Sequence, residues 1–174
     1  AIATRMTEAE KEKQRKARPI EEKESMRWLE GIRAAREVAE ACPQTQCVCV
    51  ADSEADIYEL FAEPRGLNHG GELQLLIRAC QDRAVDEAAG RLLATVRATP
   101  CLAQKSVDVS ARRPKIKITD KHAQREAARD ARIAEVEIRA TTVTLQPPSR
   151  PDRKLPAVTI NVVLVEEANP PAGA

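Results

Sequence analysis

The acidic residue at position 52 is the side chain of this sequence best placed to do chemistry. An apolar run, residues 45–51, stops at Asp52, and a segment with the apolar spacing of a helix, residues 53–63, begins directly after it. This order predicts that the Asp52 carboxylate lies at the carboxyl end of a buried strand, beside a helix start, where α/β sheets hold ligands and metals. A carboxylate there can bind Mg²⁺, which prefers oxygen ligands and needs few protein carboxylates.

A structural role for the same residues is the alternative. Ser53 and Asp56 have the spacing of a helix-capping box, in which both side chains accept hydrogen bonds from backbone N–H groups. Asp52 would then be only a favourable negative charge near the helix dipole. The two interpretations differ in what loss of the Asp52 carboxylate costs: function in the first, stability in the second.

Two strands and two helices must position Asp52. Residues 22–42 have apolar side chains every three or four positions, which predicts a helix with one apolar face. Residues 45–51 and 73–79 are predicted strands, separated by the helix 53–63 and a glycine-containing turn. A strand, a helix and a strand in this order predict a right-handed βαβ unit with a parallel strand pair.

The second half of the chain has a different pattern. After a short predicted helix at residues 86–95, three segments alternate between polar and apolar side chains, as antiparallel strands with one buried face do: 106–110, 134–140 and 158–162. A boundary near residue 100 is therefore predicted between an α/β part and a small β-rich module. Residues 1–20 are alternately charged and nearly free of large apolar side chains, which predicts a disordered segment or a frayed helix.

Composition restricts the class of protein. The net charge is only +1 although 32% of the residues are charged, which does not fit a generally basic nucleic-acid binder. Local basic clusters can still contact phosphates. The five cysteines are an odd number without metal-binding spacing, so reduced thiols and a cytoplasmic location are expected. No apolar run reaches the length of about 18 residues that a membrane helix needs.

Four segments resemble, in order, parts of a known family. Residues 48–60, Val-Cys-Val-Ala-Asp-Ser-Glu-Ala-Asp-Ile-Tyr-Glu-Leu, resemble the stretch around the second catalytic aspartate of bacterial DDE insertion-sequence transposases. These are cut-and-paste enzymes with a ribonuclease-H-like core. Residues 24–28 resemble the start of the preceding helix, residues 75–79 the next core strand, and residues 158–171 a late strand and exit turn of the family's β-rich insertion.

The resemblance implies a fold and an activity. The fold would be α/β, with a partial ribonuclease-H-like βαβ core over residues 21–100 and a small antiparallel β-rich insertion module over residues 101–174. The activity would be metal-dependent phosphoryl transfer on double-stranded DNA, meaning strand cleavage and strand transfer at the ends of a mobile element. Asp52 would be one of three carboxylates that hold Mg²⁺, for which Mn²⁺ can substitute. A homo-oligomer is also implied.

The sequence departs from the family in ways that affect this expectation. The family's first catalytic aspartate lies upstream of this stretch, and its catalytic glutamate lies downstream in a Tyr-x-x-Arg-Trp-x-Ile-Glu-type signature. Neither is found in this sequence, so the chain is expected to be an internal fragment without catalytic activity of its own. Ser53 stands where many relatives have arginine, so a basic contact is expected to be lost.

Basic residues gather in one region and near the end of the second predicted strand. Between residues 105 and 132, nine Lys and Arg stand against four Asp and Glu. Six side chains are the candidate contacts to DNA phosphates: Arg78, Arg83, Arg112, Arg113, Lys115 and Lys117. The alternative for the basic region is a solvated loop. The alternative for Arg78 is a salt bridge with Asp82 or Glu59.

Two other functions stay open at this point. The chain could be a non-catalytic DNA-binding or assembly remnant of a transposase, which the absent partner carboxylates favour. It could also be an unrelated α/β domain in which the resemblance is accidental. Whether the reading frame continues on both sides, into the missing strand and the missing glutamate helix, would separate these hypotheses.

Overall fold

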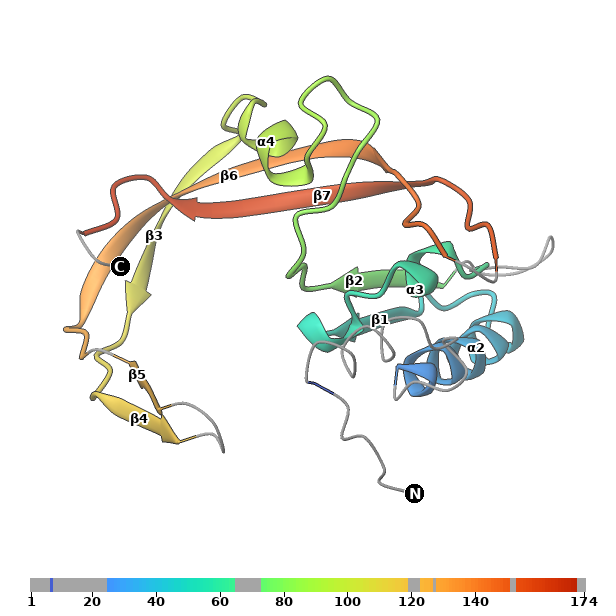
Figure 1. Ribbon diagram of the computed structural model, residues 1–174, viewed down its shortest axis with the longest axis horizontal. Coiled ribbons are helices and arrows are strands. Elements are labelled where there is room, and N and C mark those ends of the chain that lie inside the picture. Colours follow the sequence, from blue (N-terminus) through green and yellow to red (C-terminus); the bar gives the residue numbers. More distant parts are fainter. Residues whose placement is uncertain are drawn as a thin grey trace. The chain divides into compact units, whose positions relative to one another are not determined.

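The computed structural model describes residue 7 and residues 25–64, 73–118, 123–126, 128–150 and 153–171; of residues 115–118 and 123–126 only the backbone is described. The chain is a mixed α/β protein, as predicted, and its described residues form small sheets (Figure 1). The elements follow in this order: α2 (Met26–Ala41), β1 (Val48–Ala51), the 3₁₀ helix η2 (Ser53–Ala55), α3 (Tyr58–Ala62), β2 (Gln74–Ile77), α4 (Leu92–Arg97), β3 (Ala103–Val109), β4 (Lys115–Ile118), β5 (Ala123–Glu126), β6 (Arg132–Leu145) and β7 (Val158–Glu167).

The chain forms two compact units. The first comprises residues 1–86 together with 144–159, and the second comprises residues 87–143 together with 160–174. The chain passes from the first unit to the second between residues 86 and 87, and residues 144–159 belong to the first unit again. The domain boundaries at residues 20 and 100 stay predictions. Apart from Thr7, the segment 1–20 lies outside the described residues.

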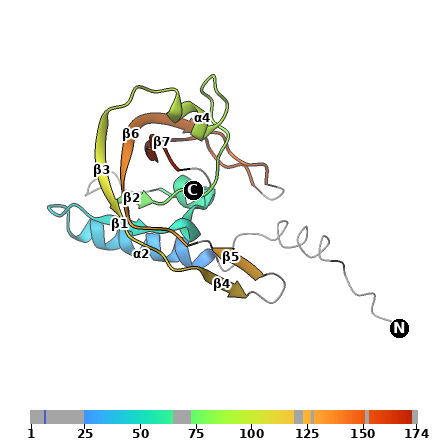
Figure 2. The same ribbon diagram turned by 90° about the vertical axis from the view of Figure 1, so that its left-hand side faces the viewer.

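A parallel strand pair forms the centre of the first unit. β1 pairs with β2 in parallel, from Val48 opposite Gln74 to Ala51 opposite Ile77, which confirms the predicted parallel pair. α2 packs along this pair, as both views show (Figures 1 and 2), and buries its Leu29 and Ile32 side chains. Its apolar side chains recur at helical spacing, so the helix can present one face to the strands.

Two predictions for this unit are wrong in detail. The continuous helix at residues 53–63 is replaced by η2 and α3, with extended backbone at Ile57 between them. The strand preceding Asp52 was predicted to be buried, but the Val48 and Val50 side chains are 47% and 71% exposed. Alternate residues of a strand point to opposite faces. Among the described residues, only one face of β1 is therefore covered.

The second unit is built on antiparallel strands, as its alternating sequence predicts. Its three-stranded sheet has the order β3-β6-β7. β3 and β6 are antiparallel, from Ala103 opposite Ile138 to Val109 opposite Arg132. The short helix α4 begins at Leu92, later than predicted. Gly90 precedes it with a φ of 67°, a conformation that glycine adopts without steric cost and that ends the preceding turn.

The strand pair β4–β5 is not predicted by the sequence pattern. Lys115 lies opposite Glu126 and Ile118 opposite Ala123, in antiparallel register. The polar and apolar residues of β4 do alternate, but over only four positions inside a run of basic residues. So short a signal does not separate a strand from a solvated basic loop.

Candidate functional site

The carboxyl ends of β1 and β2 bring two predicted site residues side by side. Asp52 directly follows β1, and Arg78 directly follows β2. The Arg78 backbone N–H donates to the Ala51 carbonyl at 3.1 Å, so the two chain segments leave the sheet together. The predicted place of Asp52, at a strand's carboxyl end next to a helix start, is confirmed.

The Asp52 side chain is exposed and only partly engaged. Its Oδ1 accepts a hydrogen bond from the Glu54 backbone N–H at 3.0 Å and so caps η2. Among the described residues no other hydrogen bond or ion pair reaches this carboxylate, so its Oδ2 is open to solvent or to a ligand. The predicted capping box is wrong, because Asp52 is the cap and neither Ser53 nor Asp56 fills that role.

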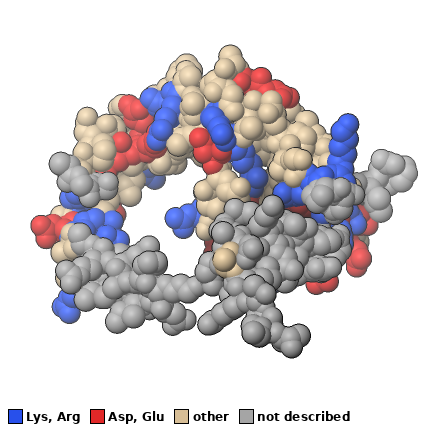
Figure 3. All heavy atoms as spheres, in the orientation of Figure 1, with Lys and Arg blue, Asp and Glu red and all other residues tan. Residues whose placement is uncertain are grey.

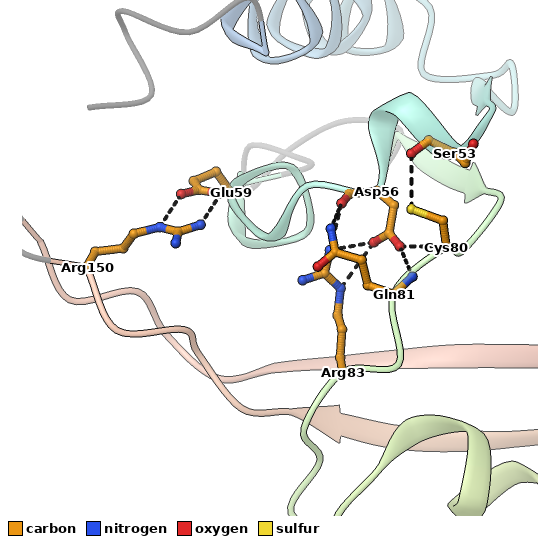
Figure 4. A network of polar contacts seen from close by, with 7 residues as sticks. All are labelled: Ser53, Asp56, Glu59, Cys80, Gln81, Arg83 and Arg150. Atoms are coloured by element: carbon orange, nitrogen blue, oxygen red, sulfur yellow. Dashed lines mark hydrogen bonds and ion pairs between the residues drawn. The ribbon is translucent and has the colours of Figure 1, made fainter. Parts of the chain in front are cut away.

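Asp56 is instead the acceptor of a buried polar network (Figure 4). It is only 3% exposed, and its Oδ2 accepts the backbone N–H groups of Cys80 at 2.7 Å and Gln81 at 2.9 Å. The Arg83 Nε donates to Oδ1 at 3.1 Å, and one Arg83 Nη donates to the Asp56 carbonyl at 2.7 Å. Burial alone raises the pKa of Asp56, but the hydrogen bonds from Cys80 and Arg83 outweigh it, so the pKa lies below its ordinary value.

Arg83 is committed to this network rather than to solvent. Its side chain is 12% exposed, and its guanidinium lies 5.4 Å from the ring centre of Phe61 and 5.8 Å from that of Tyr58. Aromatic faces attract a guanidinium at such distances. This arrangement ties the exit of β2 to α3. It leaves little of the Arg83 guanidinium open to a DNA phosphate, the contact predicted for it.

Tyr58 and Glu59, which follow Ile57, both bind the segment 144–159. The Tyr58 hydroxyl lies 3.0 Å from the Leu145 carbonyl and 2.8 Å from the Pro156 carbonyl. Burial raises the pKa of this hydroxyl, so it stays protonated and donates its hydrogen to these acceptors. Sequence reasoning missed this role, because a tyrosine after a capping turn carries no signal of partners 87 and 98 residues away.

Glu59 adds an ion pair to the same segment (Figure 4). It is 5% exposed and accepts the Arg150 Nε at 2.8 Å and an Arg150 Nη at 3.3 Å; an Arg153 Nη lies 3.9 Å away. Burial raises the pKa of Glu59, but the Arg150 hydrogen bond and the charges of both arginines outweigh it and lower the pKa below its ordinary value. Arg150 and Arg153 were not predicted as functional residues.

The remaining predicted DNA contacts belong to two different units, Arg78 to the first and the other four to the second. Arg78 is exposed and, within the described part of the chain, has no ion-pair partner, so the alternative salt bridge with Asp82 or Glu59 is not formed. Arg112 and Arg113 are exposed, and the backbone of Arg112 forms a β-bridge with that of Arg129. Lys115 and Lys117 belong to β4, but their side chains lie outside the described atoms.

The described residues form no metal centre around Asp52. They contain no group of three or more His, Cys, Asp or Glu that could hold an ion. Glu54 lies near Asp52 in the chain, but its carboxylate pairs with Arg27 at 2.8 Å. A pair of ions in phosphoryl transfer needs several carboxylates. Asp52 has the oxygen donors that such a site requires, but no group of three or more potential ligands forms among the described residues.

No protein-family model matches the chain. A search of curated proteins finds no match either. Within the described residues, no helix is long and apolar enough to cross a membrane. Inferences about function therefore depend on the geometry of the site and on the resemblance of the quoted segments.

Proposed function

We propose that this chain is part of a DDE-type transposase and that Asp52 is one of the carboxylates that hold divalent ions against DNA in the complete enzyme. The observation that carries this proposal is the exposed Asp52 carboxylate at the carboxyl end of β1, with one oxygen unused by the described residues. The segment that resembles the family's second catalytic aspartate, residues 48–60, has Asp52 at that position.

The proposal includes a ribonuclease-H-like core, of which α2, β1 and β2 would be part. A parallel pair covered by a helix on one face is consistent with such a core. In the family, the strand that bears the first catalytic aspartate would lie beside β1. The exposed Val48 and Val50 side chains mark an uncovered apolar face of β1, and such faces are normally covered by a further layer, as they would be in a complete core. Within the described residues, β1 pairs with β2 alone.

In this function Asp52 would bind Mg²⁺ or Mn²⁺, and Arg78 would contact a phosphate of double-stranded DNA. When bound, two such ions stabilise the attacking and leaving oxygens of phosphoryl transfer. A homo-oligomer and a cytoplasmic location belong to the same proposal. Because the chain supplies one carboxylate of the set, we expect the purified chain not to nick supercoiled plasmid in the presence of either ion.

Paramagnetic broadening by Mn²⁺ tests the role of Asp52 directly, since it detects weak binding. In NMR spectra of the chain, Mn²⁺ should broaden the amide signals of residues 52–54 and 78–80 first. Asp52→Asn should remove this local effect. Glu54→Gln is the matched control, because it removes a neighbouring exposed carboxylate that is paired with Arg27, and it should leave the effect in place. Uniform broadening, or equal loss in both variants, would refute Asp52 as a metal ligand.

A non-catalytic DNA-binding or assembly remnant of a transposase is the second candidate function. It is favoured because the described residues hold no group of three or more His, Cys, Asp or Glu that could bind an ion. In that case the chain should bind duplex DNA with the same affinity in the presence of Mg²⁺ and of EDTA, and Mn²⁺ should cause no local broadening at residue 52.

A further inference from the structure

β7 is a long strand at the edge of its sheet. Within the described residues it pairs with β6 alone, beside which it lies (Figure 1). The Thr142 hydroxyl of β6 donates to the Asn161 side chain of β7 at 2.8 Å, and the backbone N–H of Ala168, directly after β7, donates to the Glu135 carbonyl at 2.9 Å. Both contacts fit one antiparallel register, so no extra residue interrupts the pairing between them.

Successive residues of β7 turn their backbone groups to opposite sides. In an antiparallel pair, a residue directs both its N–H and its C=O either toward the neighbouring strand or away from it. Because Ala168 bonds to β6, the register directs the backbone groups of Asn161, Val163 and Val165 away from β6. The side chains of these three residues are exposed, by 65% at Val163 and 56% at Val165. The three residues, here called the β7 edge, are therefore accessible to another strand.

The two edges of this sheet differ in how they are protected. β3, at the opposite edge, carries Lys105 and Asp108, and charged side chains on an edge strand discourage pairing with other chains. β7 is ten residues long and has no charged residue or proline before Glu166. Its residues 158–165 are mostly β-branched, a composition that favours strand pairing. The β7 edge therefore lacks the features that keep an edge strand unpaired.

We propose that the β7 edge pairs in antiparallel fashion with the same edge of a second copy of this chain, which joins their sheets into one. A two-fold axis at Val162 places residues 159–165 of the two copies opposite each other, and none of these residues is charged. Glu166 and Glu167 of one copy then lie roughly 25 Å or more from those of the other. Parallel pairing would instead place each glutamate beside its own copy, so charge favours the antiparallel arrangement.

Long-range charge does not oppose the association of two copies. The net charge is +1, and on the described part of the face in Figure 3 the Lys and Arg side chains are interspersed with Asp and Glu. A net charge near zero promotes association of protein chains. The contact is confined to one strand and its exposed valines, which is smaller than the interface of a stable dimer. We therefore expect a weak dimer, with a Kd of roughly 100 μM.

Hydrogen exchange followed by NMR, at about 20 μM and about 1 mM protein, tests the proposal on the unaltered chain. For a Kd of roughly 100 μM, exchange at the amides of the β7 edge should slow about fourfold at the higher concentration, because the second copy supplies acceptors. The amides of Ile160, Val162 and Leu164, which bond to β6, should exchange slowly at both concentrations. If the amides of the β7 edge exchange equally at both concentrations, the proposal is overturned, whether or not the chain associates through another surface.

Sedimentation velocity with two matched variants locates the contact. Val163→Lys places a charge on the β7 edge and beside its own copy across the two-fold axis, so dimerisation should weaken at least about tenfold. Val107→Lys is the control, because it makes the same change at an exposed valine of β3, on the opposite edge of the same sheet. The control should dimerise like the wild type, and circular dichroism melts should show both variants folded. A wild type that stays monomeric at about 1 mM, or equal weakening in both variants, would refute the β7 edge as the interface.

The outcome can be separated from that of the proposed function. The proposed function includes a homo-oligomer, but the β7 contact is inferred from the strand alone and requires neither DNA nor a metal ion. If the β7 edge does not pair, a local effect of Mn²⁺ at Asp52 would still support the role of that carboxylate. If the β7 edge pairs and Mn²⁺ has no local effect, the dimer stands and the metal-binding part of the proposed function fails.

Discussion

Two groups of side chains within residues 52–59 behave in opposite ways. Asp52 is exposed, caps a single turn and has an unused oxygen. Asp56 and Glu59 are 3% and 5% exposed, and each is held by an arginine. Acidic residues that look equivalent in sequence thus separate into one that is open to a ligand and two that hold the first unit together. We expect substitutions in the two groups to have different consequences, function in the first and stability in the second.

Asp56→Ala should have the largest effect. It removes the acceptor of two backbone N–H groups and leaves the Arg83 guanidinium buried without its partner, which costs about 3–5 kcal/mol. Urea denaturation followed by circular dichroism measures the loss. Asp56→Asn keeps an acceptor oxygen and should lose less. A loss below about 1 kcal/mol for Asp56→Ala would show that the network is not what stabilises this unit.

Acidification should lower the stability of the first unit through the carboxylates of Asp56 and Glu59. Their pKa values are lowered on folding, so their ionised forms contribute stability above the ordinary values of 3.8 and 4.5, and this contribution is lost as the pH falls toward the lowered values. The urea midpoint should therefore fall as the pH is lowered below about 4.5. Asp56→Asn should show a smaller fall. An equal fall in both proteins would assign the effect to other groups.

Tyr58→Phe should have a moderate effect. It keeps the ring against Arg83 but removes the hydroxyl that donates to the Leu145 and Pro156 carbonyls, a loss of about 1 kcal/mol. Hydrogen exchange should rise at the backbone amides of residues 144–159 more than in β1 and β2. Phe61→Leu, which removes the other ring beside Arg83, should lack this local increase.

Asp52→Asn should have the smallest effect on folding. An asparagine can still accept the Glu54 N–H, and even complete loss of a cap costs about 0.5–2 kcal/mol. We expect less than about 0.5 kcal/mol in a urea melt, because the capping oxygen remains. A larger loss, at the level of Asp56→Asn, would make Asp52 a structural residue and would erase the contrast between the two groups.

The sequence was sufficient to predict the position of Asp52, but it was insufficient to predict the partners of Asp56 and Glu59. The position of Asp52 follows from local order: an apolar strand, an acid, and then a turn. The partners of Asp56 lie 24 to 27 residues away, and those of Tyr58 and Glu59 as far as 98 residues away. Periodicity carries no information about such partners. The same contacts explain why the helix predicted at residues 53–63 is interrupted, since Asp56 turns toward Cys80 and Gln81 instead of capping.

The packing of Trp28 was likewise predictable only in part. As part of the apolar face predicted for residues 22–42, Trp28 is expected in the core, and it does pack against a cluster of buried residues that comes mainly from α2, η2 and α3. It is half-buried rather than enclosed, and the Arg27 guanidinium lies 5.7 Å from its ring. An amphipathic pattern identifies the face of a helix that packs, but not how deeply each residue of that face is covered.

The Tyr58 hydroxyl contact also bears on the order of events during protein synthesis. Its acceptor at Pro156 is translated 98 residues after it. At about 5–20 residues per second, Tyr58 therefore waits roughly 5–20 seconds on the ribosome before its partner exists. Closing so long a loop also costs chain entropy before the contact forms. During that interval Tyr58 and Glu59 lack the carbonyl acceptor and the arginine that hold them in the folded unit, so α3 has no anchor to residues 144–159.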